Sequence, residues 1–135
     1  MRKIAIDAMG GENAPEAIVE AVLKAKPELP EDKFIFFGDE GKLKELLPAG
    51  DDQIEIVATT EVILDEDEPV KAMRTKKDSS MVVAANWVKE GKADALLSLG
   101  NTGALLTCGI FIVGRIKGVA RPGLMPTMPV ESSDD

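Results

Sequence analysis

Short apolar runs alternate along the chain with segments in which apolar residues recur every three or four positions. The runs end at polar or glycine residues and are typical of buried strands; they cover residues 3–7, 34–37, 54–57 and 95–98. The segments between them predict helices, and the first helix has one apolar face, formed by Ala17, Ile18, Ala21, Val22 and Ala25. Alternating strands and helices predict an α/β protein.

Capping residues locate the helix ends. Asn13, Pro15 and Glu16 form a helix-start signature in which Asn13 is the N-cap. Residues 79–90 read as a helix closed by Gly91. Two further helices are expected, a short one after Gly38-Asp39 and one that begins at Ala104.

This alternation predicts a three-layer α/β/α sandwich with a mostly parallel sheet. Ligands of open parallel sheets bind at the carboxyl ends of the strands, and the polar turns of this chain follow predicted strands. They are Asp7-Ala-Met-Gly-Gly11, Gly38-Asp39, Thr59-Thr-Glu61 and Gly100-Asn-Thr-Gly103. We therefore expect them to share one rim. A charged loop follows the third strand, and residues 124–130 form a further extended segment.

The stretch SLGNTGALLTCG, residues 98–109, places an Asn-Thr pair between glycines. Glycines let the backbone approach a ligand, and free amides at a helix start favour an anion such as phosphate. The alternative is an ordinary strand-to-helix turn, and neither standard glycine-rich nucleotide fingerprint occurs. Residues 95–114 carry no charge, but the glycine turn divides them, so a strand and a helix are expected rather than a membrane span.

Four cations precede the helix expected at 79–90, and its N-cap is expected to be Asp78 or Ser79; they are Lys71, Arg74, Lys76 and Lys77. Basic side chains and a helix start together favour an anion. The alternative is a solvated basic face offset by the acidic run 65–68.

Composition narrows the chemistry. With 135 residues, a formal net charge of −8 and no histidine, the chain is no candidate for nucleic-acid binding, common zinc sites or a histidine-based triad. One cysteine and no secretory signal indicate a cytoplasmic protein without an internal disulfide. Cys108 reads as a buried structural thiol, whereas Asp7 is either a base or a partner of its own turn amides.

Three stretches together resemble the bacterial phosphate acyltransferases of fatty acid and phospholipid synthesis, the PlsX family. They are IAIDAMGGENAPE at 4–16, EPVKAMRTKKDSSMVVAANWVKEGKADALLSLGNTGALL at 68–106 and FIVGRIKGVARP at 111–122. Departures from the family pattern fall at Glu12, Asn13 and Leu99. Family members are typically longer, so the resemblance implies that residues 1–135 are the N-terminal portion of a single, incomplete α/β domain.

The resemblance implies a fold related to the isocitrate and isopropylmalate dehydrogenases. It also implies conversion of acyl-[acyl carrier protein] and inorganic phosphate to acyl phosphate and free carrier protein, with no cofactor and no metal. Because phosphate is already an anion, catalysis without a histidine base is expected to rest on positioning the phosphate and on stabilising the oxyanion. Catalytic roles are expected for Asn101, Lys77 and Asp7.

On the same basis, phosphate binding is expected at Asn101, Thr102, Gly103, Ser79 and Ser80. Gly10, Gly11 and Gly100 are expected to shape the loops. Lys71, Arg74 and Lys76 are expected to contact the acidic carrier protein.

The resemblance further implies a homodimer and peripheral association with the inner face of the membrane. Two alternatives remain: an anion-binding metabolite-binding protein without catalysis, and a coenzyme A-dependent enzyme similar to phosphotransacetylases. A third is that this chain by itself is inactive, because it completes neither the sheet nor the active site.

Overall fold

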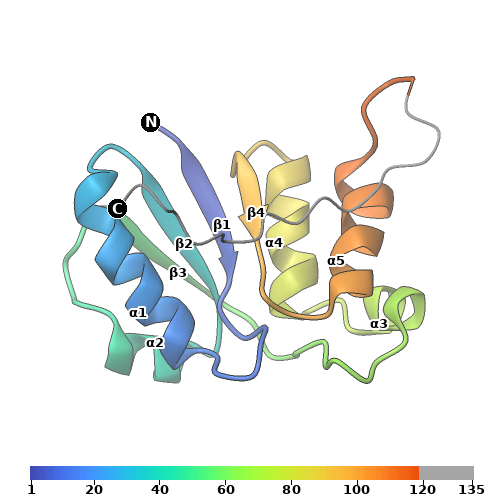
Figure 1. Cartoon of the computed structure of the whole chain (residues 1–135), viewed down its shortest axis with the longest axis horizontal. Coiled ribbons are helices and arrows are strands. Elements are labelled where there is room, and N and C mark those ends of the chain that lie inside the picture. The colour runs from blue at the N-terminus through green and yellow to red at the C-terminus, as the bar shows by residue number, and fades with distance from the viewer. Residues whose placement is uncertain (119–135) are drawn as a thin grey trace, which may run out of the picture.

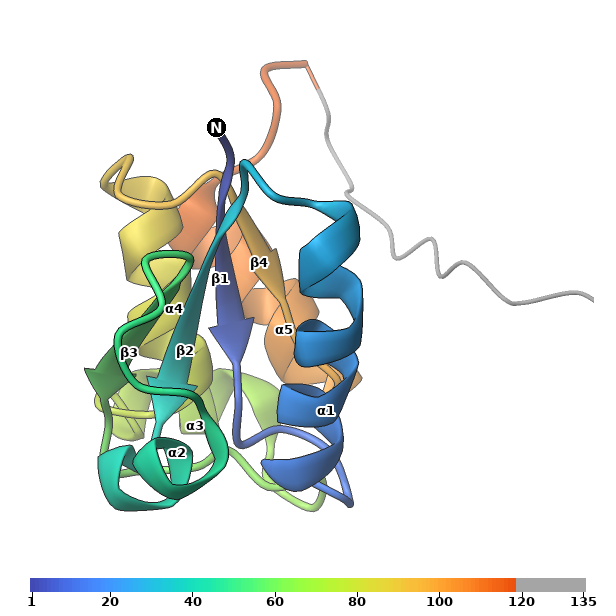
Figure 2. The ribbon, with the colours of Figure 1, turned by 90° about the vertical axis from the view of Figure 1, so that its left-hand side faces the viewer.

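The computed structural model describes residues 1–118. Its sheet has four parallel strands in the order β3-β2-β1-β4. The strands are β1 (Lys3–Asp7), β2 (Lys33–Gly38), β3 (Ile54–Ala58) and β4 (Ala95–Leu97). Figure 2 shows the arrows of β1, β2 and β4 running side by side in one direction, as the sequence predicts.

Helices lie on both faces of the sheet (Figures 1 and 2). On one face α1 (Glu16–Ala25) and α2 (Glu40–Leu46) pack Ile18 and Leu43 against Ile6 and Phe36. On the other face α4 (Ser80–Lys89) packs against Ala5, Ile35 and Phe37 of the strands. Alternate residues of β1 and β2 are therefore buried on opposite faces, which produces the expected three layers.

Two more helices extend the α4 layer. They are α3 (Pro69–Thr75) and α5 (Thr102–Cys108), and α5 continues into one π-helical turn, η2 (Gly109–Val113). Their buried residues join those of α4 in a second cluster that includes Ala72, Met81 and Cys108. A short 3₁₀ turn, η1 (Lys26–Glu28), ends α1.

The predicted strands and the helices at 40–46 and 80–89 are confirmed, with Asp39 and Ser79 as their N-caps. The cap at Asn13 is wrong. The backbone at the helix start, Pro15, is already helical, whereas a side-chain cap needs an extended residue there. The carbonyl of Asn13 instead accepts the Ala17 N–H at 3.0 Å.

The charged loop expected after β3 contains α3, which the sequence pattern missed. Glu68 caps this helix by accepting the N–H groups of Val70 and Lys71, and Pro69 occupies its first turn. The extended segment expected at 124–130 lies outside the described residues.

The uncharged stretch 95–114 divides into β4, a turn, α5 and η2, as predicted. Among the helices within residues 1–118, none has the length and apolar character needed to cross a membrane.

Candidate functional site

The strand order reverses between β1 and β4. The chain runs from β1 to β2 and β3 in one direction and then places β4 on the other side of β1. In doubly wound sheets the ligand crevice opens beyond the carboxyl ends of the strands at such a switch point. Two of the predicted polar turns, at 7–11 and 100–103, follow β1 and β4 and therefore meet there.

Asp7 holds this edge of the sheet together. Its side chain is 2% exposed, and its carboxylate accepts three hydrogen bonds from the chain. Met9 N–H donates at 3.2 Å, Ser80 Oγ at 2.5 Å and Ser98 Oγ at 2.7 Å. Since these donors come from three segments, the carboxylate fixes β1, the start of α4 and the end of β4 relative to one another.

The glycines of the two turns lie in backbone contact. A methyl group on Gly10 would lie 2.6 Å from Asp7 Oδ2 and 2.9 Å from the Gly100 nitrogen. Gly11 has a φ of 100°, which side-chain-bearing residues rarely adopt. A methyl group on Gly100 would lie 3.2 Å from Gly10 Cα. Gly10 and Gly100 are therefore needed for close approach and Gly11 for its conformation.

Asn101 caps α5 and ties down the preceding loop. Its Oδ1 accepts the Ala104 N–H at 3.0 Å, and its Nδ2 donates to the carbonyls of Leu64 and Asp67 at 3.0 and 3.1 Å. The side chain is thus engaged on both sides within the chain. Its role toward phosphate stays a prediction.

The next two residues leave backbone donors open. Thr102 is exposed and Gly103 is half-buried. Neither N–H makes a hydrogen bond within the described part of the chain. Gly103 packs on Pro69 of α3, since a methyl group there would lie 2.8 Å from Pro69 Cγ. Within residues 1–118, the turn that begins at Gly100 thus carries two backbone N–H groups without a hydrogen-bond partner.

The two predicted serines are buried at the start of α4. Ser79 is 0% exposed and accepts the Val82 N–H, and Ser80 is 1% exposed and donates to Asp7. Lys77 is exposed and forms no ion pair within residues 1–118. The structure thus brings Asp7 and Ser80 together, while both hydroxyls already serve the protein frame.

The cations of α3 differ in exposure from Lys76, the C-cap residue of that helix. Lys71 and Arg74 are exposed, whereas Lys76 is held by Asp67 Oδ2 at 2.6 Å and by the Val62 carbonyl at 2.8 Å. The hydrogen bond from Lys76, with that from the Leu64 amide, holds the pKa of the Asp67 carboxyl below its ordinary value. Lys76 therefore anchors the loop before α3.

Cys108 is fully buried in α5, as predicted. Burial, together with the negative charge of Asp7, raises the pKa of its thiol to about 11. A buried thiol that stays protonated is a poor nucleophile, which agrees with a structural role.

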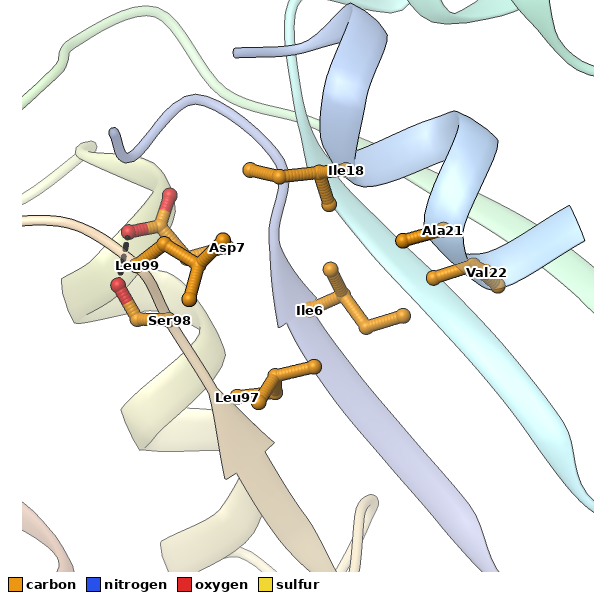
Figure 3. Close-up of a pocket in the computed structure, with 8 residues that line it drawn as sticks. All are labelled: Ile6, Asp7, Ile18, Ala21, Val22, Leu97, Ser98 and Leu99. Carbon is orange, nitrogen blue, oxygen red and sulfur yellow. Dashed lines mark hydrogen bonds between the residues drawn. The ribbon is translucent and has the colours of Figure 1, made fainter. Parts of the chain in front are cut away.

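A hollow of about 250 Å³ opens beside the cluster (Figure 3). Ile18, Ala21 and Val22 of α1 line one side of it, and Leu97 and Leu99 line the other. The Asp7–Ser98 hydrogen bond lies at one end. The walls are apolar and the polar groups gather at the strand ends.

Sequence reasoning missed Ser98 as a site residue. Ser98 comes directly after β4 and lies 91 residues from its partner Asp7 along the chain. A polar residue immediately after an apolar strand was the available signal, but the pattern does not reveal which partner it meets.

The parallel sheet and its switch point define a doubly wound α/β protein, and its candidate site lies at the ends of β1 and β4. The profile of the fatty acid synthesis protein family matches residues 2–135, and the chain belongs to that family.

Relatives named phosphate acyltransferase match the whole chain or nearly all of it. The protein of Lactobacillus delbrueckii subsp. bulgaricus is 98% identical over 135 residues, which are 100% of this chain and 41% of that protein. That of Lactobacillus acidophilus is 77% identical over 137 residues, again 100% of this chain and 41% of the relative. That of Latilactobacillus sakei is 54% identical over 134 residues, which are 98% of this chain and 39% of the relative. The chain thus spans about two-fifths of the length of these relatives.

Proposed function

We propose that the full-length protein containing this chain is a phosphate acyltransferase that makes acyl phosphate from acyl-[acyl carrier protein] and inorganic phosphate. The observation that carries the proposal is 98% identity, over the whole chain, to a protein named phosphate acyltransferase. The family match over residues 2–135 supports the same assignment to fatty acid metabolism.

The reaction asks little of a general base. A phosphate oxygen attacks the thioester carbonyl carbon, the carbon–sulfur bond breaks, and the carrier thiolate leaves and takes up a proton. Phosphate is an anion near neutral pH, so the main tasks are to orient it and to stabilise the oxyanion. A site of backbone amides without histidine is suited to both tasks.

The phosphate is proposed to bind at the turn before α5. The N–H groups of Thr102 and Gly103, which have no hydrogen-bond partner in the described part of the chain, are the donors that support this placement. Lys77, an exposed cation that precedes α4, is proposed to supply positive charge. Asn101, Ser79 and Ser80 stay predictions as phosphate contacts, because each side chain already has a protein partner. Asp7 would act by ordering the turns.

The carrier protein is proposed to approach the exposed cations of α3. Lys71 and Arg74 present positive charge on a chain whose net charge is −8, and an acidic partner would be steered there. Lys76 would contribute less to this attraction, because its charge is paired with that of Asp67. A homodimer, a cytoplasmic location and peripheral association with the inner face of the membrane are part of the same proposal.

The first test measures acyl phosphate formed by the full-length protein from phosphate and either a carrier-protein thioester or a coenzyme A thioester. Product from the carrier thioester is expected. Faster turnover of coenzyme A thioesters would replace the proposal with a phosphotransacetylase-like enzyme. Phosphate binding without turnover of either would leave a binding protein.

Thr102→Pro tests the amide donor directly. Proline fits the first position of a helix and removes the N–H together with the threonine side chain. The backbone of Asn101, with φ −55° and ψ 113°, lies outside the helical region that a following proline disfavours. The KM for phosphate should rise several-fold more than in Thr102→Ala, which keeps the amide. Asn86→Ala, on the far part of α4, serves as the control for general effects of substitution. Equal phosphate KM values in Thr102→Pro and wild type would contradict this placement.

A further inference from the structure

We infer that Ser98 is a positioning residue that sets the phosphate-binding turn, 100–103, at a fixed place relative to Asp7. The inference deepens the proposed function and rests on phosphate binding at that turn. Ser98 itself need not touch phosphate, because its hydroxyl acts through the backbone of Gly100.

The Ser98 hydroxyl has one proton to donate and lone pairs to accept with, and the chain uses both capacities. The proton goes to Asp7 Oδ2 at 2.7 Å, and the oxygen accepts the Gly100 N–H at 3.1 Å. The hydroxyl thus bridges a buried carboxylate on β1 to the first residue of the turn.

The other end of this bridge is anchored. Asp7 is 2% exposed, and its Oδ1 accepts Ser80 Oγ from α4 and the N–H of Met9. A carboxylate held from three segments has little freedom to move. A group tied to it, such as the turn bonded through Ser98, inherits that fixed position.

Close packing around the Ser98 bridge leaves little room for the turn to move. Gly10 packs on both Asp7 Oδ2 and the backbone of Gly100, and a methyl group on Gly100 would lie 3.4 Å from Ser98 Oγ. The N–H groups of Thr102 and Gly103, which have no hydrogen-bond partner within residues 1–118, follow within three residues. Because a small misplacement of binding groups is costly in catalysis, loss of the bridge should weaken phosphate binding without removing any direct contact.

The test compares wild type, Ser98→Ala, Ser98→Thr and the control Asn86→Ala in a full-length protein carrying this sequence. Calorimetry with inorganic phosphate gives a dissociation constant that needs no turnover, and steady-state kinetics give the KM for each substrate. Ser98→Ala removes both hydrogen bonds of the hydroxyl. It should weaken phosphate binding about tenfold, a change on the scale of a lost hydrogen bond, and leave the KM for the acyl thioester unchanged. Ser98→Thr, which keeps the hydroxyl at a half-buried position, should restore phosphate binding.

A double-mutant cycle tests the route through Asp7. In an Asp7→Asn background, Ser98→Ala should cost less than in wild type, since the bridge has already lost its carboxylate. Wild-type phosphate binding in Ser98→Ala, equal loss for both substrates, or full additivity with Asp7→Asn would each overturn the inference. Phosphate binding that depends on Ser98 in a protein without acyltransferase activity would uphold the inference while the proposed function fails. Absence of phosphate binding by wild type would overturn both.

Discussion

Gly10 lies where two turns of the site touch, and it has no room for a side chain. Alanine there would press its methyl group within 2.6 Å of Asp7 Oδ2 and 2.9 Å of the Gly100 nitrogen. We expect Gly10→Ala to lower the free energy of unfolding by about 1–3 kcal/mol, the usual cost of overpacking, measured by urea denaturation.

Gly109 provides the matched control for Gly10. It lies at the junction of α5 and η2 with helical backbone angles, and a methyl group there would meet no atom within 4 Å among the described residues. Gly109→Ala should therefore raise stability by about 0.4–1 kcal/mol. If both alanine variants shift stability alike, contact between the two turns is not what selects glycine at position 10.

Cys108 should be inert in the native protein. With a pKa of about 11 and full burial, about one thiol in a thousand is ionised at pH 8, and a reagent has no access to it. Alkylation by iodoacetamide, followed by mass spectrometry, should be slow in buffer and rapid in denaturant. Stoichiometric labelling of the native chain would contradict the buried position.

At the scale of elements, the loop before α3 depends on an ion pair. Lys76 binds Asp67 at 2.6 Å and lowers the pKa of that carboxyl from its ordinary 3.8. A lowered pKa contributes stability above the ordinary value, and that contribution is lost as the pH falls through the folded value. The wild type should therefore lose this contribution below pH 3.8.

Lys76→Met tests this contribution. The variant should be less stable than wild type near neutral pH, and the difference should shrink as the pH falls below 3.8, measured by thermal unfolding across the acid range. A difference that stays constant with pH would show that packing of the lysine stem, rather than its charge, stabilises the loop.

The elements could be predicted to different degrees. Strands β1 and β2 are apolar runs bounded by polar residues, so the sequence locates them without tertiary information. The sequence pattern did not predict helix α3, because its seven residues include two cations and form only a short apolar face. Its packing against α5 also depends on a contact between Pro69 and Gly103. The cap at Asn13 failed because the local backbone, not the side-chain type, decides where α1 begins.

The candidate site shows the same division. Since parallel strands end at one edge, the sequence alone predicts that the turns after β1 and β4 share a rim. It does not tell which hydroxyls Asp7 will meet, because Ser80 and Ser98 lie 73 and 91 residues away. Nor does it show that the side chains of Asn101 and Lys76 donate hydrogen bonds to loop carbonyls, which only the folded chain brings into range.

At the scale of the whole molecule, the charge distribution favours one approach for an acidic partner. The chain has a net charge of −8, yet Lys71 and Arg74 are exposed on α3, which packs against α5 and thus near the proposed phosphate turn. Complementary charge acts mainly on the rate of encounter and is screened by salt. The positive charges of α3 are thus expected to affect the binding of the carrier-protein substrate and not the rate of the chemical step.

Arg74→Glu in the full-length protein should raise the KM for the carrier-protein thioester several-fold at low salt, with the phosphate KM unchanged. The difference from wild type should narrow as ionic strength rises, because screening removes the attraction that the arginine supplied. Lys89→Glu changes net charge equally at the C-terminal end of α4 and should have little effect on either constant. Equal effects of the two reversals would mean that overall charge, and not the α3 face, governs the encounter. An unchanged KM in Arg74→Glu would remove α3 as the docking face.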